Sequence, residues 1–382
     1  MINFTERIID LAIRIQQIAA PTFHEHERAE FVRGMFEEEG LKDVAMDEVG
    51  NVYGRWTTGD GKSTDIKPLV ISAHLDTVFP FDMDLSVKRE DDKVYGIGIG
   101  DNSMGVAALF GLMWMLRERR FDFAGALLPK GHDVGVTKGD IWFVANVCEE
   151  GLGDLRGMKA VVDRYGSNVT AYLILEGMAL GHVYHKAVGV KRYRVTARTQ
   201  GGHSWSDYGQ PSAVLELSKL IVGLSALKLP SRPRTTMNVG KISGGTSINT
   251  IPSEAWIELD LRSEGQDELM ELIDGVEMLI ESASSQGVGI EADVIGERPA
   301  GEMHPDHPLI QLAQACLKEE GLDSVLTSGS TDANIPLSKG FPALVLGVTK
   351  GGGAHTKNEF IELLPIEKGM EQLVRFVEKV WE

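Results

Sequence analysis

The sequence has few cysteines, few basic residues relative to acidic ones, and no long apolar run. Its 382 residues include two cysteines, Cys148 and Cys316, which excludes a disulfide framework and favours a reducing, cytoplasmic compartment. No stretch of 18 apolar residues occurs, so we expect no membrane-spanning helix. The first residues, MINFTERIID, lack the basic start and apolar stretch of a secretory signal peptide, and they fit an amphipathic helix.

The charge balance is acidic. The 38 basic and 56 acidic side chains give a formal net charge of -18, and this argues against nucleic-acid binding, which requires a basic face. Most of this acidity is expected on a solvated surface, although it also suits a site that collects cations. Since a single core stops growing at about 250–300 residues, the length predicts two domains.

Several common enzyme motifs are absent. No G-x-S-x-G nucleophile motif occurs, and His24-Glu25-His26 does not have the H-E-x-x-H spacing of a zinc peptidase helix. The glycines of Gly96–Gly100 do not complete the G-x-G-x-x-G pattern of dinucleotide-binding loops. These absences direct attention to histidines and carboxylates elsewhere in the chain.

The hydrophobic pattern predicts an α/β layer with a mostly parallel sheet. Apolar runs typical of buried strands alternate with helical periodicity. Strands are expected at 46–56, 67–74, 140–148, 170–175 and 343–347, and helices at 4–19, 24–39, 104–118, 308–320 and 365–381. The glycine-rich stretch Gly125–Gly139 is interpreted as a surface loop insertion.

A second pattern interrupts this layer. From residue 188 the predicted order is β-α-β-β-α-β, which is typical of a ferredoxin-like α+β unit. Its strands are expected at 189–199, 235–242, 254–262 and 288–295, and its helices at 211–227 and 266–285. The prediction is therefore a first domain of residues 1–187 and 297–382, interrupted by a second domain of residues 188–296.

Candidate metal ligands follow the predicted buried strands. In open α/β sheets, ligand sites form outside the carboxyl ends of the strands, so these side chains are expected to converge. Side chains two residues apart on a strand point the same way, so His74 and Asp76 can face one centre. The candidates are His74, Asp76, Asp101, Glu149, Glu150, Glu176 and His355.

The charge of this set predicts bound cations. Five carboxylates in one crevice repel one another strongly unless cations neutralise them. Imidazoles combined with carboxylates suit Zn²⁺, with Co²⁺ or Mn²⁺ as alternatives, and two such ions can activate a water and polarise a carbonyl. Alone, a histidine at a strand end is more often structural and a Glu-Glu pair is usually a solvated turn, so the prediction depends on the complete set.

These residues resemble a known family. The chain is similar to co-catalytic dizinc metallopeptidases and deacylases, among them peptidase T, glutamate carboxypeptidase, aminoacylase, acetylornithine deacetylase and succinyl-diaminopimelate desuccinylase. The resemblance covers nearly the whole chain and implies a catalytic domain interrupted by a lid and dimerisation domain. The motifs that carry it are HLDT (74–77), GIGIGDNSMG (96–105), EEG (149–151), GGHS (201–204), GGTSINTIP (244–252), STDAN (330–334) and GGAHTKNE (352–359).

The resemblance implies roles for the clustered residues. Asp101 would bridge two metals and precede a cis peptide bond. His74 and Glu176 would complete one metal site, and Glu150 and His355 the other. Glu149 would be the general base, and Asp76 would orient His74.

The resemblance also implies roles for three residues outside the cluster. His203 would polarise the scissile carbonyl, often across a homodimer; the less favoured alternative is that it only caps a turn in GGHS. Asn249 and Arg298 would hold the substrate, since a guanidinium matches a carboxylate bidentately.

The expected activity is hydrolysis of an amide bond in a short peptide by a metal-bridging hydroxide. One alternative is an N-acyl amino acid deacylase or desuccinylase that uses the same site. Glu176 is typical of carboxypeptidase and deacylase members, whereas RPAGEMHPDHP (298–308) resembles peptidase T-like sequences, so the substrate stays open. Two non-catalytic roles also stay open: a metal-binding paralogue, which needs no general base, and an adaptor role for the Gly189–Ile295 domain.

Overall fold

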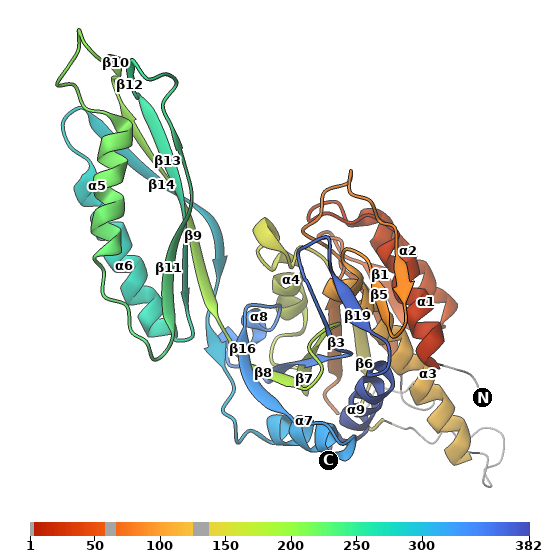
Figure 1. The fold of residues 1–382 in the computed structure, drawn as a ribbon. Coiled ribbons are helices and arrows are strands. Elements are labelled where there is room, and N and C mark those ends of the chain that lie inside the picture. Colours follow the sequence, from red (N-terminus) through yellow and green to blue (C-terminus); the bar gives the residue numbers. More distant parts are fainter. Residues whose placement is uncertain (1–3, 58–65, 125–136) are drawn as a thin grey trace. The chain divides into compact units, whose positions relative to one another are not determined.

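The computed structural model describes residues 4–57, 66–124 and 137–382 (Figure 1). The chain divides into two compact units, one formed by Met1–Lys186 and Glu302–Glu382, the other by Ala187–Gly301. Most of the predicted loop insertion Gly125–Gly139 lies outside the described residues.

The first unit is built on a nine-stranded mixed sheet. At its centre four neighbouring strands, β6, β3, β7 and β17, run parallel. Antiparallel strands flank them, among them β2 beside β6 and β8 beside β17. In sheet order the strands are β1 (Lys42–Met46), β2 (Val52–Trp56), β6 (Ile141–Asn146), β3 (Leu69–His74), β7 (Ala171–Glu176), β17 (Ala343–Gly347), β8 (His182–Ala187) and β15 (Gly301–Glu302), with β16 (Val325–Gly329) paired to β8. The predicted fold class is thereby confirmed.

The central parallel strands are buried on both faces. Every residue of β3 and of β17 is buried, which explains their continuous apolar runs. The helices of this unit are α1 (Phe4–Gln16), α2 (His26–Glu38), α3 (Met104–Ala124), α4 (Arg156–Tyr165), α7 (Pro308–Glu319), α8 (Asn334–Ser338) and α9 (Ile366–Lys379).

Helix α3 is the apolar centre of the helical layer. It contacts strands β3 and β7 and helices α1 and α9. Within the described residues, the stretch Ile99–Arg119 is long and apolar enough to cross a membrane, but 89% of its apolar 18-residue window is buried inside the protein. This burial is the behaviour of a core helix.

A small four-stranded sheet positions two loops of the first unit. Its order is β18 (Gly351–Gly352), β19 (Phe360–Glu362), β5 (Lys93–Tyr95) and β4 (Lys88–Glu90). Strands β5 and β19 are antiparallel, with Tyr95 opposite Phe360. The chain that leaves β5 and the chain that enters β19 therefore lie at the same end of this pair.

The second unit is an antiparallel sheet with two helices on one face (Figure 1). The sheet order is β11 (Thr235–Gly244), β13 (Glu254–Ser263), β9 (Gly189–Thr199) and β14 (Val288–Arg298), and the helices are α5 (Ala213–Ser225) and α6 (Gln266–Ala283). Every second residue of β13 is buried, so one face of the sheet packs under the helices. The order β-α-β-β-α-β is the predicted one.

The structure differs from two local predictions. Residues 46–56 do not form one strand, because Asp47 begins a turn in which its carboxylate accepts N–H groups from Val49, Gly50 and Asn51, and β1 and β2 form a hairpin. Strand β14 does not stop before Gly296 but passes it with a register shift and continues to Arg298. The second unit therefore extends further than the predicted residue 296.

Candidate metal centre

The candidate ligands of the first unit follow neighbouring elements. His74 is the last residue of β3, and Glu176 is the last residue of β7, which pairs with β3. Glu150 lies in the loop after β6, on the other side of β3. Asp101 lies in the turn Ile99–Ser103 that opens helix α3, and the peptide bond after it is cis. His355 lies in the loop between β18 and β19.

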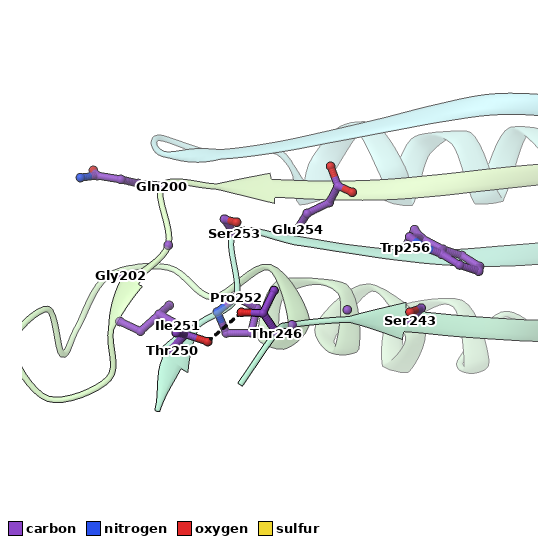
Figure 2. A pocket seen from close by; sticks show the side chains of 13 residues that line it. Gln200, Gly202, Ser243, Thr246, Thr250, Ile251, Pro252, Ser253, Glu254 and Trp256 are labelled. Atoms are coloured by element: carbon purple, nitrogen blue, oxygen red, sulfur yellow. Dashed lines mark hydrogen bonds between the residues drawn. The ribbon is translucent and has the colours of Figure 1, made fainter. Parts of the chain in front are cut away.

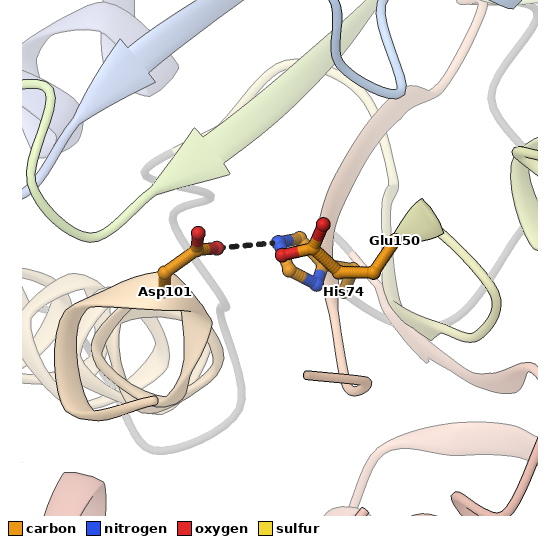
Figure 3. Close-up of side chains that lie close together, drawn as sticks. All are labelled: His74, Asp101 and Glu150. Atoms are coloured by element: carbon orange, nitrogen blue, oxygen red, sulfur yellow. Dashed lines mark ion pairs between the residues drawn. The ribbon is translucent and has the colours of Figure 1, made fainter. Parts of the chain in front are cut away.

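Asp101 lies between the two histidines. Its Oδ1 is 3.2 Å from Nε2 of His74, and its Oδ2 is 3.0 Å from Nε2 of His355. Oε2 of Glu176 lies 3.9 Å from Nε2 of His74, and Oε1 of Glu150 lies 3.0 Å from Nε2 of His355. Figure 3 shows the side chains of His74, Asp101 and Glu150 gathered at one point.

The donor atoms fit two divalent metal ions. They form two sets that share Asp101, each with one imidazole and one further carboxylate. Ligand atoms about 2.0–2.2 Å from a tetrahedral zinc lie about 3.3–3.6 Å from one another. The separations of 3.0–3.9 Å bracket this range. The donor atoms within each set are therefore close enough together to bind the same metal ion.

Electrostatics favour positive charge at this point. Hydrogen bonds with Asp101 and Glu150 raise the pKa of His355 to about 10. Burial would lower the pKa of His74, but its contacts with Asp101 and Asp76 raise it well above the usual value. Burial raises the pKa of Glu176 to about 8, and the charge of Asp101 adds to this. The carboxylates thus stabilise cations, whether imidazolium or metal.

Asp76 organises the loop that carries the two glutamates. It is fully buried, and its carboxylate accepts the N–H of Glu149 at 2.9 Å, the N–H of Glu150 at 2.8 Å and the hydroxyl of Thr22 at 2.9 Å. Its Oδ1 also lies 3.5 Å from Nδ1 of His74. Burial would raise the pKa of Asp76, but His74 and the two N–H groups lower it. That Asp76 orients His74 stays a prediction.

Glu359 is a residue of the centre to which sequence reasoning gave no role. Its buried carboxylate accepts N–H groups from Gly98, Gly100 and Asp101 at 2.8–2.9 Å. Burial raises its pKa to about 7, while these hydrogen bonds lower it. The motif GGAHTKNE ends on this residue, but nothing local shows that its partners lie some 260 positions earlier in the chain.

The second unit holds the remaining candidates. His203 is exposed, and its Nδ1 accepts the N–H of Trp205 at 3.2 Å, so it does cap a turn. Asn249 lies beside it, because its carbonyl accepts the N–H of Ser204 at 3.0 Å. Arg298 is buried opposite Val190, at the far end of β9 and about 30 Å away along the strand. Within one chain the structure does not bring Arg298 together with His203.

A pocket of about 410 Å³ opens at the His203 end of this unit (Figure 2). It is lined by Gln200–Gly202, Ser243–Thr246, Thr250–Glu254 and Trp256. Its strands β10 (Gly202–His203) and β12 (Thr250–Ile251) pair with each other, which the sequence pattern did not predict.

Comparison with known sequences decides the family. The profile of Peptidase family M20/M25/M40 matches residues 70–379, which is most of the chain. The chain belongs to this family. The predicted family resemblance is confirmed, and so is the prediction of a metal-dependent hydrolase of peptide or N-acyl amino acid amide bonds.

Relatives within the M20 family differ in their named substrates. The chain is 25% identical to the succinyl-diaminopimelate desuccinylase of Corynebacterium glutamicum over 92% of its own length and 90% of the relative. It shares its fold with aminopeptidase PepT of Bacillus cereus, at a TM-score of 0.78, 22% identity and 99% coverage of both chains. A dinuclear metal-binding M20 peptidase of Bacillus subtilis gives a TM-score of 0.69, with 16% identity and 98% coverage of both chains.

Proposed function

We propose that this M20 hydrolase is a two-zinc peptidase that cleaves an amide bond of a short peptide. The observation that carries the proposal is Asp101, whose two carboxylate oxygens face different imidazoles at 3.2 and 3.0 Å. A carboxylate placed in this way suits a bridge between two cations. Bound in the two donor sets, such cations would supply Lewis-acid polarisation of the carbonyl and a water of lowered pKa.

Side chains of this protein would transfer the proton of the attacking water. Glu149 is buried, and its backbone N–H donates to Asp76 at 2.9 Å. Its carboxylate would accept the proton of the attacking water. The water oxygen bonds to the carbonyl carbon, and Glu149 then delivers the proton to the nitrogen as the carbon–nitrogen bond breaks. His203 donates a hydrogen bond to the carbonyl oxygen, where negative charge develops.

His203 belongs to a different unit from all the proposed metal ligands. We propose that it acts either through closure of the second unit or from the partner chain of a homodimer. Asn249, adjacent to it, would hold the substrate backbone. Arg298 lies about 30 Å from His203 along the strand of the same chain, so it would meet the carboxylate of a short substrate only where His203 and Asn249 come from the partner chain. The two buried, unpaired cysteines suit a reducing cytoplasm.

A deacylase is the second candidate. It is favoured by Glu176 at the end of β7, a residue typical of deacylase and carboxypeptidase members, and by the desuccinylase relative. Peptides and N-acyl amino acids both contain a scissile amide bond, so the two donor sets suit either substrate.

A hydrolysis screen tests the proposal and separates the two candidates. Protein loaded with zinc, and in parallel with cobalt, is incubated with dipeptides, tripeptides, N-acetyl and N-succinyl amino acids, and the released amine is measured. Turnover of free peptides supports the peptidase, and turnover of acyl amino acids alone supports the deacylase. Protein that binds metal but hydrolyses none of these is the result expected of a non-catalytic paralogue.

A further inference from the structure

One buried carboxylate of the centre has no part in the chemistry proposed above. Glu359 has no exposed surface, and its two oxygens accept three backbone N–H groups. Gly98 donates to Oε2 at 2.9 Å, and Gly100 and Asp101 donate to Oε1 at 2.8 and 2.9 Å. With its oxygens engaged in this way, Glu359 is suited to hold the backbone rather than a metal.

The backbone that Glu359 holds is the turn that presents Asp101. Gly98 has a φ of 69°, in the left-handed region, and a side chain on Gly100 would collide with Met178. N–H groups in a buried turn of this kind need acceptors, because an unpaired one costs as much as a lost hydrogen bond. One carboxylate supplies the acceptors for all three.

Glu359 also belongs to the loop that carries His355. Both residues precede β19, and the Asp101 turn follows β5, the strand paired with β19. A further hydrogen bond, from the N–H of Gly96 to the carbonyl of Glu359 at 3.0 Å, joins the two segments. The contacts of Glu359 therefore fix one ligand loop against the other.

We propose that Glu359 is a positioning residue that sets the Asp101 backbone relative to His355, so that each oxygen of Asp101 reaches its own metal. The inference rests on the proposed function, since it assumes that Asp101 and His355 are ligands. The inference predicts that Glu359, which is not itself a proposed ligand, contributes to zinc affinity at both sites.

The test compares two acid-to-amide variants. Glu359→Gln keeps the volume of the side chain but points an NH₂ group at one or two of the three N–H donors. Asp47→Asn is the matched control, because Asp47 also accepts three backbone N–H groups at a turn of the first unit, from Val49, Gly50 and Asn51. None of the proposed ligands lies in that turn.

Zinc affinity is measured by competition with a chromogenic chelator, and unfolding of the metal-free proteins by circular dichroism. We expect Glu359→Gln to weaken binding of both zinc equivalents by about 10–100-fold, the typical effect of losing a partner of the ligands. Asp47→Asn should lose stability but bind zinc as the wild type does. Glu359→Asp, which keeps the charge but cannot reach all three donors, should fall between wild type and Glu359→Gln.

Equal zinc affinity in folded Glu359→Gln and wild type would overturn the inference and leave the proposed function intact. If Glu359→Gln does not fold, Glu359→Asp with wild-type affinity is the overturning result. Wild-type protein that takes up no zinc would instead refute the proposed function, and with it the inference.

Discussion

Asp76→Asn tests how the Glu149–Glu150 loop is held. The substitution keeps the size of a fully buried side chain but replaces one of its oxygens with an NH₂ group. The native carboxylate accepts two backbone N–H groups and the hydroxyl of Thr22. Whichever way the amide turns, its NH₂ group faces at least one of these donors, so at least one hydrogen bond is lost.

The expected loss of stability follows from the number of hydrogen bonds removed. A hydrogen bond to a charged group contributes about 1.5–3 kcal/mol, so the free energy of unfolding of metal-free Asp76→Asn should fall by at least this amount. Asp76 also lies 3.5 Å from His74, and removing a partner of a metal-ligating histidine typically lowers metal affinity by about 10–100-fold.

Urea unfolding of the metal-free protein and zinc titration calorimetry measure both effects. Thr22→Val is the matched control, because it removes one donor to Asp76 and leaves the carboxylate charge. It removes one hydrogen bond to a charged group, so it should cost about 1.5–3 kcal/mol, but it should leave zinc affinity near that of the wild type. An Asp76→Asn variant with wild-type stability and zinc affinity would refute this account of the loop.

Three other substitutions address the base, the second unit and its core. Glu149→Ala should retain both zinc equivalents and lower kcat by about 10²–10⁴-fold, and loss of zinc would show that Glu149 is itself a ligand. His203→Ala should fold, bind zinc and give the mass of a homodimer in light scattering, as we expect of the wild type, but have a lower kcat/KM; an unchanged kcat/KM would remove His203 from the mechanism. Leu217→Ala in the buried face of α5 should destabilise the second unit by about 2–5 kcal/mol in urea unfolding without changing zinc affinity, and a cost below about 1 kcal/mol would contradict the packing described.

Local sequence patterns predicted the part of the site that lies at strand ends. The apolar run before His74 and the one before Glu176 each predicted a buried strand, and both strands end on the candidate ligand. Because parallel strands end at the same edge of a sheet, their convergence could be inferred without coordinates. Asp101 and His355 joined the set because they follow the glycine-rich stretch 96–100 and the predicted strand 343–347, and the family resemblance then implied their roles.

Features that depend on distant contacts could not be predicted in this way. The bonds of Glu359 to the Asp101 turn join positions some 260 residues apart, and neither segment has a local pattern that indicates its partner. The hairpin of β1 and β2 was missed although Asp47 and Gly50 are typical turn residues, because apolar residues on both sides suggested one continuous strand. The pairing of β10 with β12 joins strands of two residues each, too short to give a periodic signal.

Metal stoichiometry tests the central claim most directly. Protein stripped with a chelator is reloaded with excess zinc and desalted, and its zinc is measured by elemental analysis against protein concentration from amino-acid analysis. The two donor sets around Asp101 predict a value close to two zinc ions per chain, falling toward one in His355→Ala. A reproducible wild-type value near zero would contradict the two-metal centre, and a wild-type value of one would show that Asp101 does not bridge two ions.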